Sequence, residues 1–153
     1  MDYGKSQLNV LFDLGSDWIT LPTKNCTSCT GGRSANNGSY VALGNLTGRT
    51  YGSAQLNGFN YQDNLCFTTD MSTCASVTYF GMVNQTGLNP KVDGVIGLSQ
   101  NSPFSGDVNS YSPRAGPLFM DALKQNQVIQ TDIFSLCMRG YKGDQSSIDF
   151  GQP

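Results

Sequence analysis

Short apolar runs separated by turn-forming residues dominate the chain and predict a mostly β protein. From Gln7 to Pro22, two apolar runs flank the sequence Asp13-Leu-Gly-Ser16, which predicts two short strands joined by a turn. Residues 23–48 are rich in Asn, Gly, Ser and Thr and predict a surface stretch. The same alternation of apolar runs and turn residues predicts further strands over residues 63–67, 75–83, 91–99, 131–138 and 147–151.

Two other local patterns predict a hairpin and a helix. The segment from Thr50 to Phe59, which reads TYGSAQLNGF, indicates a hairpin with a glycine-bearing tip. A helix is predicted to begin at Gly116-Pro117, because proline suits the first helical position. Its apolar face would consist of Leu118, Phe119, Ala122 and Leu123. The fold class is therefore mostly β with one or two short helices.

The composition narrows the class of protein. A chain of 153 residues has room for one domain with its own core, and 38% apolar against 13% charged residues fits a globular, turn-rich domain. The formal net charge of −2 offers no basic surface to nucleic acid, and no apolar run is long enough to predict a membrane span. Because the chain has no histidine, Ser-His and Cys-His catalysis are excluded. Any chemistry must use carboxylates, hydroxyls, Cys, Lys or Tyr.

Five cysteines allow three arrangements. Cys26 and Cys29 have the spacing of a redox pair, although no thioredoxin-like βαβ pattern surrounds them. Together with Cys66 and Cys74 they could instead hold a structural zinc ion. The third arrangement is a pair of local disulfides, Cys26–Cys29 and Cys66–Cys74. We predict the disulfides, since the members of each pair lie close in sequence around a turn-rich loop, and we expect Cys137 to be a buried thiol in a strand.

Four glycosylation sequons accompany the paired cysteines. They are Asn25-Cys-Thr27, Asn37-Gly-Ser39, Asn45-Leu-Thr47 and Asn84-Gln-Thr86. Sequons and disulfides together predict a glycoprotein of a secreted or a lysosomal or vacuolar setting. The start of the chain, Met1-Asp-Tyr-Gly4, is polar, so the targeting segment is expected to be missing from this sequence.

Five segments stand along the chain in the order VLFDLGSDW, TYGSAQLNG, VDGVIGLS, GPLFMDALKQNQVIQTDIFSLCM and IDFG. This order resembles the amino-terminal lobe of pepsin-like aspartic proteases, and the likeness runs from Lys5 to Gly151. It implies one lobe of a bilobal, mostly β fold, with a substrate cleft between lobes that each supply one aspartate. Residues 1–153 contain only one Asp-x-Gly-Ser motif. We therefore expect an incomplete amino-terminal lobe, without the family's first strands and without the second lobe.

The resemblance assigns roles to individual residues. Asp13 matches the catalytic aspartate, Gly15 the turn glycine, and Ser16 the residue whose hydroxyl hydrogen-bonds to that carboxylate. Tyr51 matches the tyrosine of the flap, the hairpin that folds over bound peptide, with its tip at Gly52 and Ser53.

Other positions complete or break the family pattern. Val95-Ile96-Gly97 matches the apolar-apolar-Gly segment that crosses beneath the active-site loop. Leu14 stands where the family has a threonine, whose hydroxyl helps to brace the two active-site loops. Trp18 is expected to pack in the core or in a pocket wall.

The function implied by the resemblance is that of an aspartic-type endopeptidase. It needs no metal and no cofactor, and its expected partners are a peptide or protein substrate and the second lobe, without which this lobe is expected to be inactive. Two alternatives stay open. One is a catalytically inactive, pepsin-like peptide-binding protein, with Leu14 as the sign of decay. The other is a protease in which two copies each supply one aspartate, which the length of the chain and its long loops disfavour.

Overall fold

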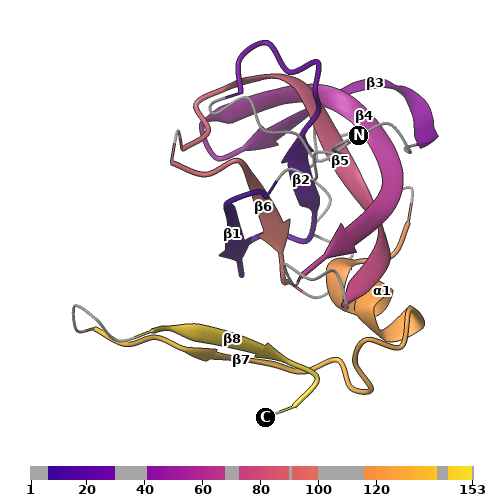
Figure 1. Cartoon of the computed structure of the whole chain (residues 1–153). Helices are drawn as coiled ribbons and strands as arrows, with labels where there is room; N and C mark the ends of the chain where they lie inside the picture. Colours follow the sequence, from indigo (N-terminus) through magenta and orange to yellow (C-terminus); the bar gives the residue numbers. More distant parts are fainter. Residues whose placement is uncertain are drawn as a thin grey trace, which may run out of the picture.

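The computed structural model describes residues 7–29, 41–67, 73–89, 91–99, 116–140 and 145–152. Within these ranges the chain is mostly β, as predicted. The main sheet has the strand order β1-β6-β2-β5-β4-β3, and β7 and β8 form a separate two-stranded sheet (Figure 1). The elements are β1 (Val10–Asp13), β2 (Ile19–Pro22), β3 (Val41–Tyr51), β4 (Ala54–Cys66), β5 (Cys74–Thr86), β6 (Gly94–Gly97), α1 (Phe119–Gln125), β7 (Phe134–Cys137) and β8 (Ser147–Phe150).

The long central strand β5 is packed on both of its faces. Successive side chains of a strand point to opposite faces, and here Val77 and Tyr79 belong to one buried cluster while Phe80 and Met82 belong to another. The larger cluster also includes Ile19, Leu21, Ile96, Phe119 and Leu123. The core therefore lies on both sides of β5, beside the strands that carry the Asp13 turn.

The helix α1 covers one end of the main sheet and packs against β5 (Figure 1). Its predicted apolar face is confirmed, since Leu118, Phe119, Ala122 and Leu123 are all buried. The helix starts later than predicted, at Phe119, because Leu118 is still extended, with ψ of 163°. No helix in the described part of the chain is long and apolar enough to cross a membrane.

The strand β3 was not predicted from the sequence. The described residues of 23–48 lie mostly at the surface as expected, but from Val41 on they form β3, which pairs with β4 on both sides of a register shift. β3 is the edge strand of the sheet, where backbone hydrogen bonds to β4 keep it in place. Many of its side chains are polar and do not alternate regularly with apolar ones, so the sequence pattern did not indicate a strand. A shift of register between Leu43 and Thr47, with Gly44 at φ +80°, further breaks the pattern.

Both predicted disulfides are present. Cys26–Cys29 closes the turn after β2, and Cys66–Cys74 joins residues that face each other across β4 and β5. These bonds use all four sulfurs that a zinc site would require, so the zinc alternative is wrong. The prediction for Cys137 is also wrong, because this free thiol is exposed. It lies at the end of β7, in the small sheet that extends away from the main sheet (Figure 1).

Candidate active site

Asp13 ends β1 and enters a tight turn. Its backbone pairs with Gly97 in the parallel β1–β6 ladder, and its side chain is half-buried. The carboxylate oxygen Oδ1 accepts a hydrogen bond of 3.0 Å from the Gly15 amide. This is the local turn that an Asp-x-Gly sequence favours, and its hydrogen bond fixes the direction of the carboxylate.

The segment β6 holds the loop from Asp13 to Trp18 through backbone hydrogen bonds. The Leu98 amide donates to the Asp13 carbonyl at 2.8 Å, and the Gly97 amide donates to the Trp18 carbonyl at 2.8 Å. The Ser99 amide donates to the Ser16 carbonyl at 3.0 Å. The Val95-Ile96-Gly97 segment thus lies against the loop, between β1 and β2, where the resemblance puts it.

The expected hydrogen bond from Ser16 to Asp13 is absent. The Ser16 hydroxyl oxygen is buried and has no hydrogen-bond partner among the described residues. The turn does not need it, since the Gly15 amide already satisfies one carboxylate oxygen of Asp13. Gly15 therefore supports the turn as expected, and the role given to the Ser16 hydroxyl is corrected.

The predicted hairpin is formed by β3 and β4. Tyr51 pairs with Ala54, so Gly52 and Ser53 make a two-residue turn and both are exposed. Gly52 has φ of +55°, a conformation that the tight hairpin turns require and that glycine adopts without strain. The hairpin tip is thus where the sequence placed it.

Tyr51 links this hairpin to the strand that follows the Asp13 turn. Its hydroxyl oxygen lies 3.1 Å from the Thr20 hydroxyl oxygen, at hydrogen-bond distance. Burial raises the pKa of Tyr51 above its ordinary value of 10.0; the Thr20 bond and Arg49 oppose this, and the charges of Asp17 and Asp13 add to it. Tyr51 is therefore a neutral phenol within electrostatic reach of Asp13.

Replacing Tyr51 with Phe should change stability in alkali. The folded state binds the phenol proton more tightly than the unfolded chain, so this stabilisation is complete below pH 10.0 and is lost as the pH rises above it. Tyr51→Phe should cost about 0.5–1.5 kcal/mol at neutral pH through the lost hydrogen bond, yet lose less stability above pH 10.0. Urea unfolding over a pH series measures both effects. The control Thr20→Val removes the same bond but should keep the alkaline loss, and an alkaline loss in Tyr51→Phe equal to that of the unmodified chain would contradict the assignment.

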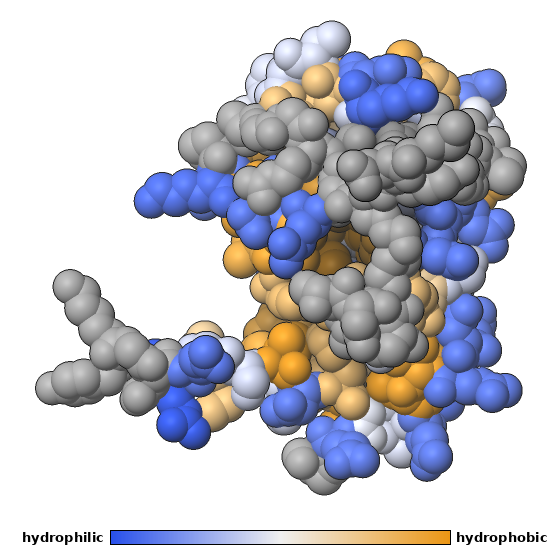
Figure 2. Space-filling model, in the orientation of Figure 1, coloured by the Kyte–Doolittle hydropathy of each residue, from blue (hydrophilic) through white to orange (hydrophobic). Residues whose placement is uncertain are grey.

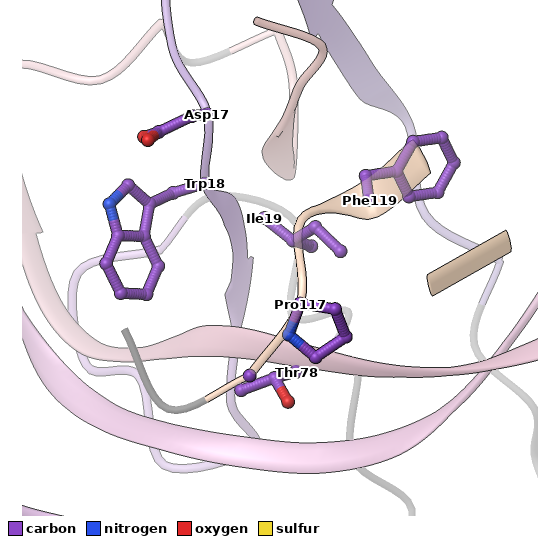
Figure 3. Close-up of a pocket in the computed structure, with 7 residues that line it drawn as sticks. Asp17, Trp18, Ile19, Thr78, Pro117 and Phe119 are labelled. Carbon is purple, nitrogen blue, oxygen red and sulfur yellow. The ribbon is translucent and has the colours of Figure 1, made fainter. Parts of the chain in front are cut away.

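A small cavity lies beside the loop and is not a substrate site. Its walls include Trp18, Ile19, Thr78, Pro117 and Phe119, and Figure 3 shows Pro117 close to Thr78 below the loop. The volume of about 10 Å³ has room for about one water molecule. A space of this size cannot hold a peptide side chain.

Arg49 was not singled out from the sequence; it is a buried residue of the hairpin strand β3. The available signal was its position two residues before Tyr51, which puts both side chains on one face of β3. The guanidinium group of Arg49 stacks on the ring of Trp18, which is half-buried. This contact agrees with the packing role expected for the tryptophan.

Comparison with known proteins identifies the family. The model of the eukaryotic aspartyl protease family matches residues 3–153. The chain therefore belongs to that family, and its mostly β architecture is that of one lobe of the pepsin-like fold. The protein is of the aspartic-type peptidase kind. No curated protein matches the chain significantly.

Proposed function

We propose that residues 1–153 are the amino-terminal lobe of an aspartic endopeptidase, in which Asp13 is one of two catalytic aspartates. The observation that carries the proposal is the position of Asp13. Its carboxylate stands at the end of β1, in a turn clamped by β6, and Tyr51 of the β3–β4 hairpin lies within electrostatic reach.

The chemistry follows from two carboxylates that share one water molecule. Like charges held close together cannot both ionise easily, so one carboxyl stays protonated, a pairing for which aspartic proteases are the standard example. The protonated carboxyl polarises the peptide carbonyl, and the ionised one takes a proton from the water as it attacks. Gly52 and Ser53 at the hairpin tip, with Tyr51, would cover the peptide and hold it over Asp13.

Exposed apolar side chains support a second lobe as the partner. Leu11 and Leu14 flank Asp13 and are 50% and 57% exposed, and Leu136 and Met138 are 44% and 85% exposed at the end of β7. Apolar residues that gather in one exposed patch mark interaction sites, whereas single exposed ones are common. Figure 2 shows apolar residues gathered in a hollow of the molecule, above the β7–β8 sheet that is labelled in Figure 1. A second lobe on this side would bring the second aspartate to Asp13, and the lobe alone would be inactive.

The sequons and disulfides favour a secreted or a lysosomal or vacuolar glycoprotein. Of the four sequon asparagines, Asn25, Asn45 and Asn84 are exposed, and Asn37 lies outside the described residues. Both disulfides need an oxidising compartment. Members of this family are typically secreted or lysosomal.

Peptide cleavage tests the proposed function. The protein completed by a second lobe should cleave peptides at acid pH, and a statine-containing peptide should block it, because the statine hydroxyl mimics the tetrahedral intermediate. The 153-residue chain alone should cleave nothing at any pH. Cleavage by the monomeric chain, or activity of the complete protein that statine leaves untouched, would refute the two-aspartate assignment.

Leu14 is the observation that favours the second candidate, a peptide-binding protein without activity. Its exposed side chain cannot donate the hydrogen bond that a threonine would give to the opposite loop. Leu14→Thr in the complete protein should therefore raise stability by about 0.5–1.5 kcal/mol or raise turnover. Thermal unfolding and kcat measure this. If neither changes, Leu14 is neutral and the inactive candidate loses its main support; statine binding without cleavage by either form would favour it.

A further inference from the structure

Arg49 places a positive charge in the interior of the lobe. The residue is only 4% exposed, and its guanidinium carbon lies 3.1 Å from the ring centre of Trp18 and 4.3 Å from that of Phe80. Its Nη2 donates a hydrogen bond of 3.0 Å to Oδ1 of Asn60. Burying a charge is unfavourable unless bonds and neighbouring groups compensate for it. The contacts to Arg49 come from the residue before β2, from β5 and from β4.

The contact between Arg49 and Trp18 joins the hairpin to the segment that follows the Asp13 turn, beside the contact between Tyr51 and Thr20. Arg49 and Tyr51 project from the same face of β3, since alternate residues of a strand share a face. They meet Trp18 and Thr20, which have the same two-residue spacing in the segment that follows the Asp13 turn. The hairpin is thereby attached at two points to the chain that carries Asp13.

We propose that Arg49 is a positioning residue, whose stack on Trp18 sets the hairpin tip relative to the Asp13 loop. The inference rests on the proposed function, because it concerns how that site is assembled. Arg49 does not touch substrate, since it is buried beneath the hairpin. Stability alone does not require a cation in this place, because apolar side chains commonly replace buried charges without loss. A flat, charged guanidinium group instead fixes the orientation of the aromatic rings that it contacts, and a flexible apolar side chain would not do so.

The fluorescence of Trp18 tests the contact directly. The chain contains a single tryptophan, so its emission reports the environment of this ring alone. Arg49→Met should shift the emission of the 153-residue chain, because the cation leaves the face of the indole. Arg139→Met is the matched control, since it removes the same charge from an exposed position and should leave the emission unchanged. Identical spectra for the unmodified chain and Arg49→Met would overturn the inference.

Kinetics separates positioning from simple stabilisation. In the complete two-lobed protein, Arg49→Met should lower kcat about tenfold with KM within about twofold, because small displacements of catalytic geometry have effects of this size or larger. Arg49→Lys keeps the charge but not the planar stack, and should recover only part of the loss. Lys91→Met, which removes a positive charge from an exposed position outside the β7–β8 sheet, should have full activity. If Arg49→Met unfolds at a lower temperature but keeps the kcat of the unmodified protein per folded molecule, the inference is overturned. If Arg49→Met does not fold, the same comparison of unfolding temperature and kcat is made with Arg49→Lys.

The two proposals fail in different ways. If Asp13→Asn retains activity, the proposed function is wrong whatever Arg49 does. If Asp13→Asn is inactive while both Arg49 variants match the unmodified protein in kcat, KM and emission, the proposed function stands and the inference about Arg49 is wrong. If the complete protein cleaves no peptide, the proposed function fails, and the emission of Trp18 decides whether Arg49 sets the loop.

Discussion

Asp13→Asn should abolish peptide cleavage by the complete protein while leaving its fold intact. The substitution is isosteric, and an amide oxygen can still accept the 3.0 Å hydrogen bond from Gly15, so the turn should persist. An amide can neither take a proton from water nor share one with a second carboxylate. We therefore expect a loss of kcat of roughly 10³- to 10⁵-fold, the usual range for removal of one group of a catalytic unit.

The pH profile and a matched control complete this experiment. The unmodified protein should be active at acid pH and lose activity as the pH rises, because a dyad in which both carboxyls ionise lacks the acid. Asp121→Asn makes the same change at an exposed position on α1 and should leave kcat unchanged. Thermal unfolding of Asp13→Asn within about 0.5 kcal/mol of the unmodified protein would show that the loss is chemical. Retained turnover in Asp13→Asn would remove Asp13 from the mechanism.

Local sequence patterns predicted the elements whose signals are local. The Asp13 turn, the hairpin tip at Gly52 and the apolar face of α1 each depend on residues within a few positions of one another. They could be predicted because turn chemistry and helical periodicity act over that range. The disulfides followed in the same way from short spacing.

Contacts between distant strands could not be predicted from such patterns. The polar first half of β3 is held by its ladder with β4, and the exposure of Cys137 depends on a small sheet that leaves the main one. Arg49 is a stronger case, because arginine is usually a surface residue. Only the fold brings Trp18 and Phe80 around it, from positions far away in sequence. The turn at Asp13 and the hairpin tip could therefore be predicted from the sequence, but the buried contacts beneath them could not.

Gly97→Ala should distort the loop that carries Asp13. An added Cβ would lie 2.5 Å from the Ser16 carbonyl oxygen and 2.6 Å from the Trp18 amide nitrogen. Both are backbone atoms that cannot rotate away, so the loop or β6 must move. The same glycine pairs with Asp13 and donates to the Trp18 carbonyl, so the displacement reaches the carboxylate directly.

The expected effect of Gly97→Ala appears in both stability and activity. Overpacking of this kind lowers the free energy of unfolding by about 1–3 kcal/mol, and a shift of about 1 Å in a catalytic group lowers the rate about a hundredfold. Urea unfolding of the 153-residue chain measures the first effect, and kcat of the complete protein the second. Gly140→Ala is the control, because nothing lies within 4 Å of its added Cβ. Unchanged stability and unchanged kcat in Gly97→Ala would mean that β6 does not hold the Asp13 loop in place; a loss of kcat in a variant whose Trp18 emission also shifts would locate the fault in that loop.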